Sequence, residues 1–590
     1  MSPARRARPR TPGRRIAGAA TGLLAALAAV LASEALAALL TGVTSPLLAV
    51  GNRAVDATPL PLKEFAIRTF GSHDKQVLIG GVVLTVFLLA AVAGAVGVRR
   101  PRVALGAFVL LSLVAAAAVV TDRASTARVP VRLVPVVALV VVGAVGLLLL
   151  LRTLRSPSRS SAVGGARAAD TAPTSDEGSA AWSATSTAPP VDSVEQGARR
   201  TSETRRDGKP RLLIGELGGR EDLLPVHVAG DDLPPSFDRR AFLVTVSAVG
   251  AVAVVSGGVR QAFGGSAAAA ARSDVTLPAA ATPAPAVPSG ALLDVPGISP
   301  YLTPSKDFYR VDTALRVPDV PVDGYTLRVH GLVDHELNLS FEDLLSRRLV
   351  ERRITLTCVS NPVGGKYIGN ATWLGIPVRD LLAEAGVKSG ADAVKSTSAD
   401  KMTIGTPLQA LDDPHRDALI AVGMNGQPLP LEHGFPVRMV VPGLYGYVSA
   451  TKWLVDLEVT RFADFKAYWS TRGYSVKAPI KTSSRIDVPK PFQQVRKGRV
   501  AVAGVAWSQD RGIRAVEVRV DGGPWQRAEL AAQDNIDTWR QWMWMWDAET
   551  GNHTIEVRAT DDSGYTQTDA RAAIAPNGST GWHSVNVTSS

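Results

Sequence analysis

Four long apolar runs dominate the N-terminal part of this 590-residue chain, at residues 16–40, 77–98, 103–120 and 133–151. Each run is close to the ~20 residues that an α-helix needs to cross the hydrocarbon core of a bilayer. Runs of this length with so few charges rarely pack inside small soluble folds. We therefore predict four transmembrane helices within residues 1–155, with Glu34 as the one charge at depth in the first run.

Arginines at three places along this region predict its orientation. Six arginines precede the first run, and further groups lie between runs two and three (Arg99, Arg100, Arg102) and after run four (Arg152, Arg155, Arg159). Because basic residues are retained on the cytoplasmic side, all three places belong there. The net charge of +11 is thus mainly a topology signal. No basic patch is interleaved with aromatic residues, which disfavours nucleic-acid binding.

Two segments without apolar periodicity follow. Residues 156–235 are rich in Ser, Ala, Thr and Arg, which predicts a mostly disordered cytoplasmic linker. Residues 236–262 contain Arg239-Arg240 before a fifth, shorter apolar run (241–259), a pattern that resembles a twin-arginine export signal. The alternative is the ordinary basic flank of a membrane span. Residues 263–290 form a second linker, rich in Ala and Pro, and the chain beyond it is expected outside the cytoplasm.

Cys358 is the only cysteine, so it can form neither an intramolecular disulfide nor a tetrathiolate metal site. It ends an alternating run, residues 353–358, which predicts a strand with Ile354, Leu356 and Cys358 on one face. A side chain at the end of a strand can project into a cleft. The residues alone leave four roles open: buried spacer, exposed thiol, nucleophile, or one soft ligand of a metal.

The C-terminal half predicts two domains. Residues 291–485 show short mixed elements: residues 325–333 alternate like a strand, Ser340 can cap a helix, and Pro377 and Gly386 bound another. From residue 486 to 590, short strands alternate with turns at regular spacing, which predicts an all-β, Ig-like sandwich. The expected fold is therefore N-terminal transmembrane α-helices, an α+β domain and a C-terminal sandwich.

Four motifs in order carry a family resemblance: residues 357–361 (Thr-Cys-Val-Ser-Asn), 424–430 (Met-Asn-Gly-Gln-Pro-Leu-Pro), 433–438 (His-Gly-Phe-Pro-Val-Arg) and 452–454 (Lys-Trp-Leu). They resemble the sulfite oxidase family of molybdopterin enzymes, from about residue 301 to the C-terminus. The resemblance implies a molybdenum cofactor, bound through a pterin dithiolene and the Cys358 thiolate. It also implies the cofactor-binding residues, which are Asn361, His433, Arg438 and Lys452.

The same resemblance implies a substrate site. Arg310 lies 48 residues before Cys358, as the family's substrate-site arginine does, and Tyr474 aligns with an active-site tyrosine. Arg472 is either a second cation or a surface arginine. The family also carries two arginines soon after the cysteine, where this chain has Pro362-Val363. Lys366 is a candidate replacement, although Gly364-Gly365 before it indicates a flexible loop, so sulfite as the substrate is in doubt.

These features together predict a membrane-anchored molybdenum oxidoreductase that transfers an oxygen atom on a small sulfur oxyanion outside the cytoplasm. Reduction of an S-oxide, as in the related periplasmic methionine sulfoxide reductases, is the alternative that Pro362-Val363 favours. The chain has no Cys-x-x-Cys-His motif and no histidine in the four runs, so we expect no haem in it. Electrons then pass through a separate redox partner, a cytochrome or a quinone-linked protein.

Other readings of the two ends of the chain stay open. The C-terminal sandwich resembles the dimerisation domain of the family, which implies a homodimer. A non-catalytic, membrane-anchored Ig-like binding protein is a rival from another class, and it predicts indifference to replacement of Cys358. A transport role for the apolar runs would have Glu34 as its only conspicuous polar residue.

Overall fold

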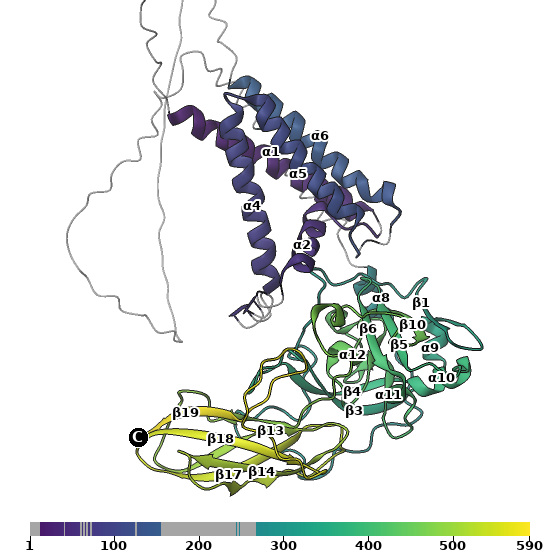
Figure 1. The fold of residues 1–590 in the computed structure, drawn as a ribbon, viewed down its shortest axis with the longest axis vertical. Helices are drawn as coiled ribbons and strands as arrows, with labels where there is room; N and C mark the ends of the chain where they lie inside the picture. The colour runs from purple at the N-terminus through teal and green to yellow at the C-terminus, as the bar shows by residue number, and fades with distance from the viewer. Residues whose placement is uncertain are drawn as a thin grey trace, which may run out of the picture.

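The computed structural model describes residues 12–40, 42–59, 62, 65–66, 69–70, 74–123, 125, 127–154, 244, 247 and 267–590. The predicted linker at residues 156–235, the twin-arginine-like motif at Arg239-Arg240 and nearly all of the fifth apolar run lie outside the described residues. The described chain forms a helical domain, a mixed α/β domain and a β domain (Figure 1).

The four predicted apolar runs lie in four helices that are long and apolar enough to cross a membrane: α1 (Pro12–Leu39), α4 (Asp74–Gly97), α5 (Pro101–Val120) and α6 (Val129–Thr153). A shorter helix, α2 (Pro46–Ala57), begins after Ser45, whose hydroxyl accepts a hydrogen bond from the Leu48 N–H at 3.4 Å. Figure 1 shows α2 at the end of the helices that faces the α/β domain.

Small residues bring α1 and α4 into close contact. A Cβ added to Gly22 would lie 2.0 Å from the Ala90 carbonyl oxygen, and one added to Gly94 would lie 2.2 Å from the Gly18 carbonyl oxygen. Any larger side chain at these positions would push the helices apart. Close backbone approach at small residues is a common basis for helix association in membranes.

The α/β domain is built on two sheets, the first mixed and the second antiparallel. The first has the strand order β2-β1-β10-β5-β6 and the second the order β3-β4-β7-β8, with β9 also paired to β7. The strands are β1 (Thr326–Gly331), β2 (Leu337–Ser340), β3 (Val350–Thr357), β4 (Ile368–Pro377), β5 (Ala393–Ser398), β6 (Thr403–Pro407), β7 (Leu419–Met424), β8 (Gln427–Pro428), β9 (Arg438–Val440) and β10 (Leu454–Thr460). The helices are α8 (Ala267–Asp274), α9 (Phe341–Leu345), α10 (Val378–Ala385), α11 (Leu408–Asp412) and α12 (Gly446–Ser449), with the 3-10 turns η2 (Leu431–His433) and η3 (Ser470–Arg472).

Several local predictions are confirmed. Ser340 caps α9 in a reciprocal pair with Asp343, whose N–H lies 3.1 Å from the Ser340 hydroxyl. Helix α10 ends at Gly386, which adopts a left-handed conformation with φ of 69°. Cys358 comes directly after β3. These features were predictable because caps and strand alternation depend on neighbouring residues alone.

The described part of the Ala/Pro segment that we predicted as a linker, residues 267–290, lies against the α/β domain. Its Ala281 N–H donates to the Leu349 carbonyl at 2.8 Å, and Thr282 pairs with Val350 as a short parallel bridge. Val275 and Leu277 pack against the buried core of the domain. This stretch therefore extends the edge of the second sheet at β3.

The C-terminal domain is a sandwich of two sheets, with the strand orders β11-β13-β17-β16 and β12-β19-β18-β14-β15. Its strands are β11 (Ser483–Val488), β12 (Gln494–Val495), β13 (Gly498–Trp507), β14 (Ile513–Val520), β15 (Gln526–Arg527), β16 (Glu529–Leu530), β17 (Arg540–Ala548), β18 (Gly551–Asp561) and β19 (His583–Ser589). Val502 and Trp542 from one sheet share a buried core with Val516 and Val557 from the other. The Ig-like classification of this sandwich stays a prediction.

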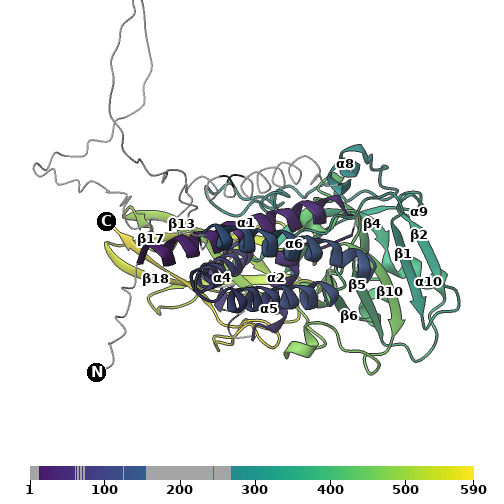
Figure 2. The same cartoon turned by 90° about the horizontal axis from the view of Figure 1, so that it is seen from above.

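Tryptophans join the sandwich to the α/β domain. Trp507 and Trp539 are buried in the core of the α/β domain, and the Trp539 indole N–H donates to the Tyr301 carbonyl at 2.8 Å. Trp525 differs, because it stacks edge-on against Trp582 at a centroid distance of 5.0 Å, partly exposed. Trp507 and Trp539 are thus core residues at the junction of the two domains. Seen from above, the helical domain overlaps both C-terminal domains in projection (Figure 2), but Figure 1 shows that it lies next to the α/β domain and apart from the sandwich.

Candidate active site

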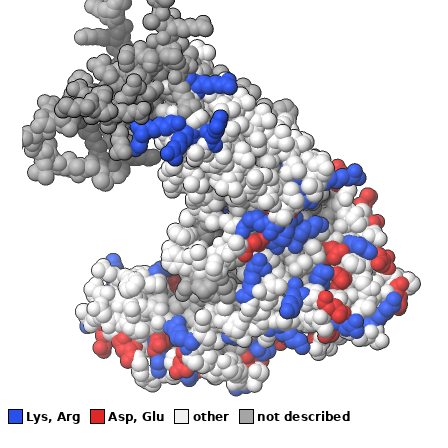
Figure 3. Space-filling model, turned by 45° about the horizontal axis from the view of Figure 1, so that its top comes forward, with Lys and Arg blue, Asp and Glu red and all other residues white. Residues whose placement is uncertain are grey.

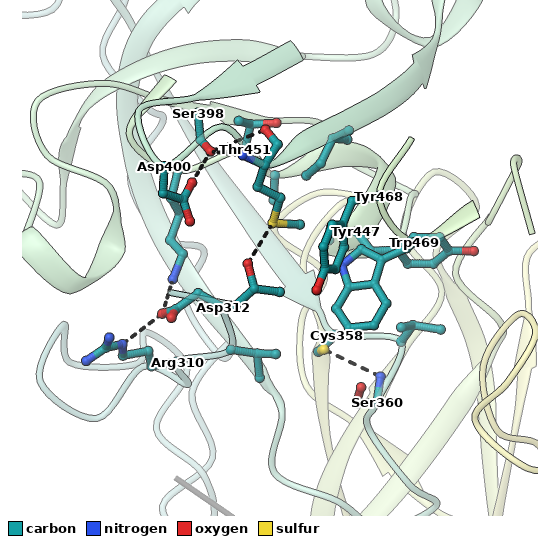
Figure 4. A pocket seen from close by; sticks show the side chains of 18 of the residues that line it. Arg310, Asp312, Cys358, Ser360, Ser398, Asp400, Tyr447, Thr451, Tyr468 and Trp469 are labelled. Atoms are coloured by element: carbon teal, nitrogen blue, oxygen red, sulfur yellow. Dashed lines mark hydrogen bonds and ion pairs between the residues drawn. The ribbon is translucent and has the colours of Figure 1, made fainter. Parts of the chain in front are cut away.

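A cavity of about 350 Å³ lies between the α/β domain and the helical domain. Six of the seven predicted site residues line it: Arg310, Cys358, His433, Arg438, Lys452 and Tyr474. Asn361 does not. The cavity thus collects residues from the loop after β3, from β9, from η2 and from helices α2 and α4, far apart in the sequence (Figure 4).

Cys358 enters the cavity from the end of β3. Its backbone N–H donates to the Tyr367 carbonyl at 2.9 Å, and its Sγ accepts a hydrogen bond from the Ser360 N–H at 3.4 Å. Burial raises the pKa of the Cys358 thiol. The protein alone therefore favours the protonated thiol, and a bound cation would be needed to hold it as the thiolate.

Asn361 fixes the loop that follows the cysteine. Its side-chain oxygen accepts from the Tyr367 N–H at 2.8 Å, and its carbonyl accepts from the Ser579 hydroxyl at 2.8 Å. Arg485 of β11 donates to the Gly365 carbonyl at 2.7 Å. Lys366 in this loop is exposed and does not line the cavity. The loop is therefore held by the C-terminal domain, and Asn361 supports the site rather than facing it.

His583 of β19 packs against the same loop, because a Cβ added to Gly364 would clash with its ring. Burial, with Arg485 nearby, lowers the pKa of His583 to about 4. Between pH 6.5 and 4 the unfolded chain binds a proton at this residue that the folded chain does not bind. His583 therefore makes the protein less stable as the pH falls through this range.

We expect His583→Gln to flatten the dependence of the melting temperature on pH between 7 and 4.5. The matched control is His553→Gln, because Asp521 raises the pKa of His553 and its contribution to stability is lost as the pH rises. The slope between pH 6.5 and 4.5 should therefore be nearly the same in His553→Gln as in the wild type, because the contribution of His553 is fully present below pH 6.5. Equal slopes in His583→Gln and the wild type would contradict the assignment of a buried, neutral His583.

Arg438 and His433 lie on either side of a tight turn at Gly434, whose φ is 111°. Arg438 is only 4% exposed, donates to the His433 carbonyl at 3.0 Å and stacks over Trp373 at 4.9 Å. Within the described chain, no carboxylate lies within ion-pair distance of its guanidinium, and burial lowers its pKa to about 10. A buried cation without a carboxylate partner is costly, which indicates a site for an anion.

His433 is neutral in this setting. Burial, together with the charges of Arg438 and Lys452, lowers its pKa to about 3. Its Nε2 lies 3.0 Å from the Ser305 carbonyl, so this nitrogen carries the proton and donates. The other ring nitrogen is then left as an acceptor, and the residue adds no charge to the cavity at neutral pH.

Asp312 gathers three cations in one buried cluster. Its Oδ2 accepts from Arg310 Nε at 2.8 Å and from Lys452 Nζ at 2.7 Å, and its Oδ1 accepts from Lys75. Its side chain is only 3% exposed. Burial would raise the pKa of Asp312, but Lys452, Lys75 and Arg310 together hold it well below its usual range. Burial also lowers the pKa of Lys452, to about 8, against the attraction of Asp312.

The two predicted substrate residues differ in their surroundings. Arg310 lines the cavity with its guanidinium turned toward Asp312, on the opposite side of the view in Figure 4 from Cys358. Tyr474 is buried between Tyr447 and Trp469, each with its ring centroid 5.4 Å away. Arg472 is not part of the lining, because it stacks over Tyr468 at 3.5 Å and pairs with Asp56 of α2 at 3.6 Å.

Sequence reasoning missed several lining residues. Burial raises the pKa of the Tyr309 hydroxyl, and this side chain lies close to Cys358 and Arg438. Its place beside Arg310 was the available signal. Lys75 and Leu78 come from α4, and no local pattern connects that helix with a cavity more than two hundred residues later.

Comparisons with known proteins match this half of the chain. The family described as "Oxidoreductase molybdopterin binding domain" matches residues 314–469. Mitochondrial sulfite oxidase of Rattus norvegicus is 32% identical over 341 residues, covering 49% of this chain and 61% of the relative. Sulfite oxidase of Gallus gallus is 33% identical over 322 residues, covering 46% of this chain and 70% of the relative. The sulfane dehydrogenase SoxCD from Paracoccus pantotrophus is 25% identical and covers 51% of this chain and 84% of that one, with a TM-score of 0.44.

These matches imply a molybdenum-molybdopterin cofactor, and the cavity residues fit it. This chain spans less than two thirds of the rat relative, and the matched region includes Cys358, His433, Arg438 and Lys452. The buried Arg438 offers an unsatisfied cation to a phosphate, and Cys358 offers a soft sulfur ligand. Among the described residues, no cluster of three or more His, Cys, Asp or Glu could hold a metal ion. A metal that is held by one thiolate and an organic ligand needs no such cluster, so this result is consistent with the implied cofactor.

Proposed function

Because this chain belongs to the sulfite oxidase family of molybdopterin-dependent oxidoreductases, we propose that it transfers an oxygen atom in a two-electron reaction on a small sulfur oxyanion. The observation that carries this proposal is the meeting of Cys358, Arg310, Arg438 and Lys452 in one cavity. Cys358 can ligate a soft metal, Arg438 can bind a phosphate and Arg310 can bind an anionic substrate. A site that binds both the cofactor and the substrate needs all three.

The residues divide between cofactor and substrate. When bound, the molybdenum cofactor supplies the two-electron chemistry of oxygen-atom transfer. Cys358 would ligate the metal, and Arg438 and Lys452 would hold the pterin phosphate by charge-assisted hydrogen bonds. The neutral His433, whose Nε2 donates to the Ser305 carbonyl, would accept a hydrogen bond from the cofactor through its other ring nitrogen. Arg310, fixed through Nε by Asp312, would present its two Nη groups to an oxyanion. Tyr474 would orient the substrate, and the aromatic side chains around it exclude water.

Reduction of a neutral S-oxide is the second candidate. Pro362 and Val363 add no cation to the loop after Cys358, and the only lysine of that loop, Lys366, is exposed outside the cavity. A dianion needs convergent positive charge, whereas an S-oxide needs fewer donors. The membership of an oxidoreductase family argues against the remote alternative of a non-catalytic Ig-like binding protein.

We also propose that the helices anchor the enzyme in a membrane and that the catalytic domain lies outside the cytoplasm. The α/β domain contacts the end of the helices that carries Asp56, Lys75 and Arg123. Arg99, Arg100, Arg102 and Arg152 lie at the other end, where basic atoms gather in Figure 3. At the catalytic end, Arg123 pairs with Asp56 and Lys75 with Asp312, while Arg53 and Arg132 donate to backbone carbonyls. This arrangement supports the orientation predicted from the arginines.

The electron route is proposed by the same reasoning. We predict no haem in this chain, so a separate cytochrome or quinone-linked protein would carry the electrons. The C-terminal sandwich, residues 486–590, would support a homodimer. Both points rest on the family resemblance.

The test is to purify the full chain from a host that makes the cofactor and to measure molybdenum, pterin and two activities. We expect about one molybdenum and one pterin per chain, with sulfite oxidation by an artificial acceptor faster than sulfoxide reduction by an artificial donor. Faster sulfoxide reduction would select the second candidate. A folded chain with neither metal nor pterin would reject both.

A further inference from the structure

The helical domain forms one wall of the active-site cavity. Val55 of α2, Thr58 after it, and Lys75 and Leu78 of α4 line the same space as Cys358 and Arg310. Three of these four side chains carry no charge, so Lys75 is a cation set in a weakly polar wall. Charges act more strongly on a ligand in such surroundings than at an open surface.

Lys75 is held at this wall by the catalytic domain. Its ammonium donates to Asp312, the carboxylate that also binds Arg310 and Lys452, and to the Ala314 carbonyl at 2.7 Å. Its side chain is 20% exposed. Asp312 therefore links a residue from the first turn of α4 to both catalytic-domain cations on this side of the cavity.

The charge of the cavity depends on this contribution. Four cations line it, and two carboxylates, Asp312 and Asp400, oppose them. The cations are Lys75, Arg310, Arg438 and Lys452. If Lys75 were absent, only Arg310 and Lys452 would neutralise the Asp312 carboxylate. Each of them would then be less available to bind an anion. The loop after Cys358 supplies no replacement, because Lys366 is exposed and lies outside the lining.

We propose that Lys75 is a specificity-determining residue that makes the cavity select a dianionic substrate, so that the active site is complete only with the helical domain in place. The inference rests on the proposed oxygen-atom transfer at this cavity, and it names the substrate class. It assigns to α4 the positive charge that residues 362–366 do not provide.

A second contact between the domains offers a matched control. Asp56 of α2 accepts from the Tyr468 hydroxyl at 3.1 Å and pairs with Arg472 at 3.6 Å. Asp56 joins the same two domains as Lys75 does, yet it does not line the cavity. Asp56→Asn therefore weakens the docking of the helical domain without removing a cavity charge.

The test uses the cofactor-loaded full chain, with sulfate as the dianionic probe and dimethyl sulfoxide as the neutral one. The measurement is the probe concentration that half-saturates the rise in melting temperature. We expect Lys75→Met to raise this concentration for sulfate about tenfold, because Asp312 would then draw more strongly on Arg310 and Lys452 and leave both less available to the anion. Lys75→Arg should stay near the wild type, Asp56→Asn should bind sulfate normally, and no variant should change for dimethyl sulfoxide.

Two outcomes would overturn the proposal: normal sulfate binding by Lys75→Met, or an equal loss in Asp56→Asn, which would mean that Lys75 acts only through docking. If Lys75→Met fails to fold, Lys75→Gln takes its place, since its amide can still donate to Asp312 and Ala314. Molybdenum per chain is measured in every variant. A wild type without molybdenum rejects the proposed function, whereas a loaded enzyme with unchanged sulfate binding rejects only the role of Lys75.

Discussion

Replacing Cys358 with serine is expected to abolish turnover while the chain stays folded. Loss of a supporting residue around a metal typically costs about 10- to 100-fold in activity or metal affinity, so loss of the ligand itself should exceed about 100-fold. A hydroxyl is a harder and far less acidic ligand than a thiol. The readouts are molybdenum per chain, the absorption spectrum of the metal and turnover of sulfite.

The control is Ser360→Ala in the same loop, which keeps the backbone N–H that Cys358 Sγ accepts. It should retain molybdenum and most of the activity. The melting temperature of the cofactor-free Cys358→Ser chain should be close to that of the cofactor-free wild type, because a serine hydroxyl can accept the same hydrogen bond from the Ser360 N–H. A fully active Cys358→Ser enzyme would show that the metal is held by other residues.

Arg438→Met is expected to act with opposite signs on the two forms of the protein. In the cofactor-free form it removes a buried cation without a carboxylate partner, so the melting temperature should be unchanged or higher. In the loaded form it removes the partner of a phosphate, which should weaken cofactor binding by about 2–5 kcal/mol. The measurements are melting temperature with and without cofactor, and pterin retained after dialysis.

Arg353 of β3 is the matched control, since it is equally buried but paired with Asp534. Arg353→Met leaves Asp534 as an unpaired buried charge and should destabilise both forms, by about 3–5 kcal/mol. A fall in the stability of cofactor-free Arg438→Met as large as that of Arg353→Met would contradict the view that Arg438 awaits an anion.

The parts of the fold that the sequence predicted depend on neighbouring residues. The apolar runs became helices, and the capped turns at Ser340 and Gly386 lie where their residue types require them. The motifs around Cys358 and His433 were recognisable because their order along the chain is the signal. These predictions needed no knowledge of how distant segments meet.

The remainder depended on contacts between domains. Alternation in β3 placed Thr355 and Thr357 on the face opposite Ile354 and Leu356, yet both threonines are buried. The backbone N–H of Trp539 donates to the Thr355 hydroxyl at 2.8 Å, so the sandwich covers that face of the strand. Lys75 reaches Asp312 across 237 residues, and no periodicity in either segment predicts the pairing. Long-range polar contacts of this kind leave no local pattern.

The support of the loop after Cys358 by the last strands constrains the order of biogenesis. Arg485, Ser579 and His583 fix residues 361–365, and they come more than a hundred residues later in the chain. A nascent polypeptide that has just released β3 and β4 therefore lacks the residues that shape the cysteine loop. A shortened chain that ends before β19 would leave the ribosome without a formed metal pocket. We therefore expect insertion of the cofactor to follow the synthesis of β19.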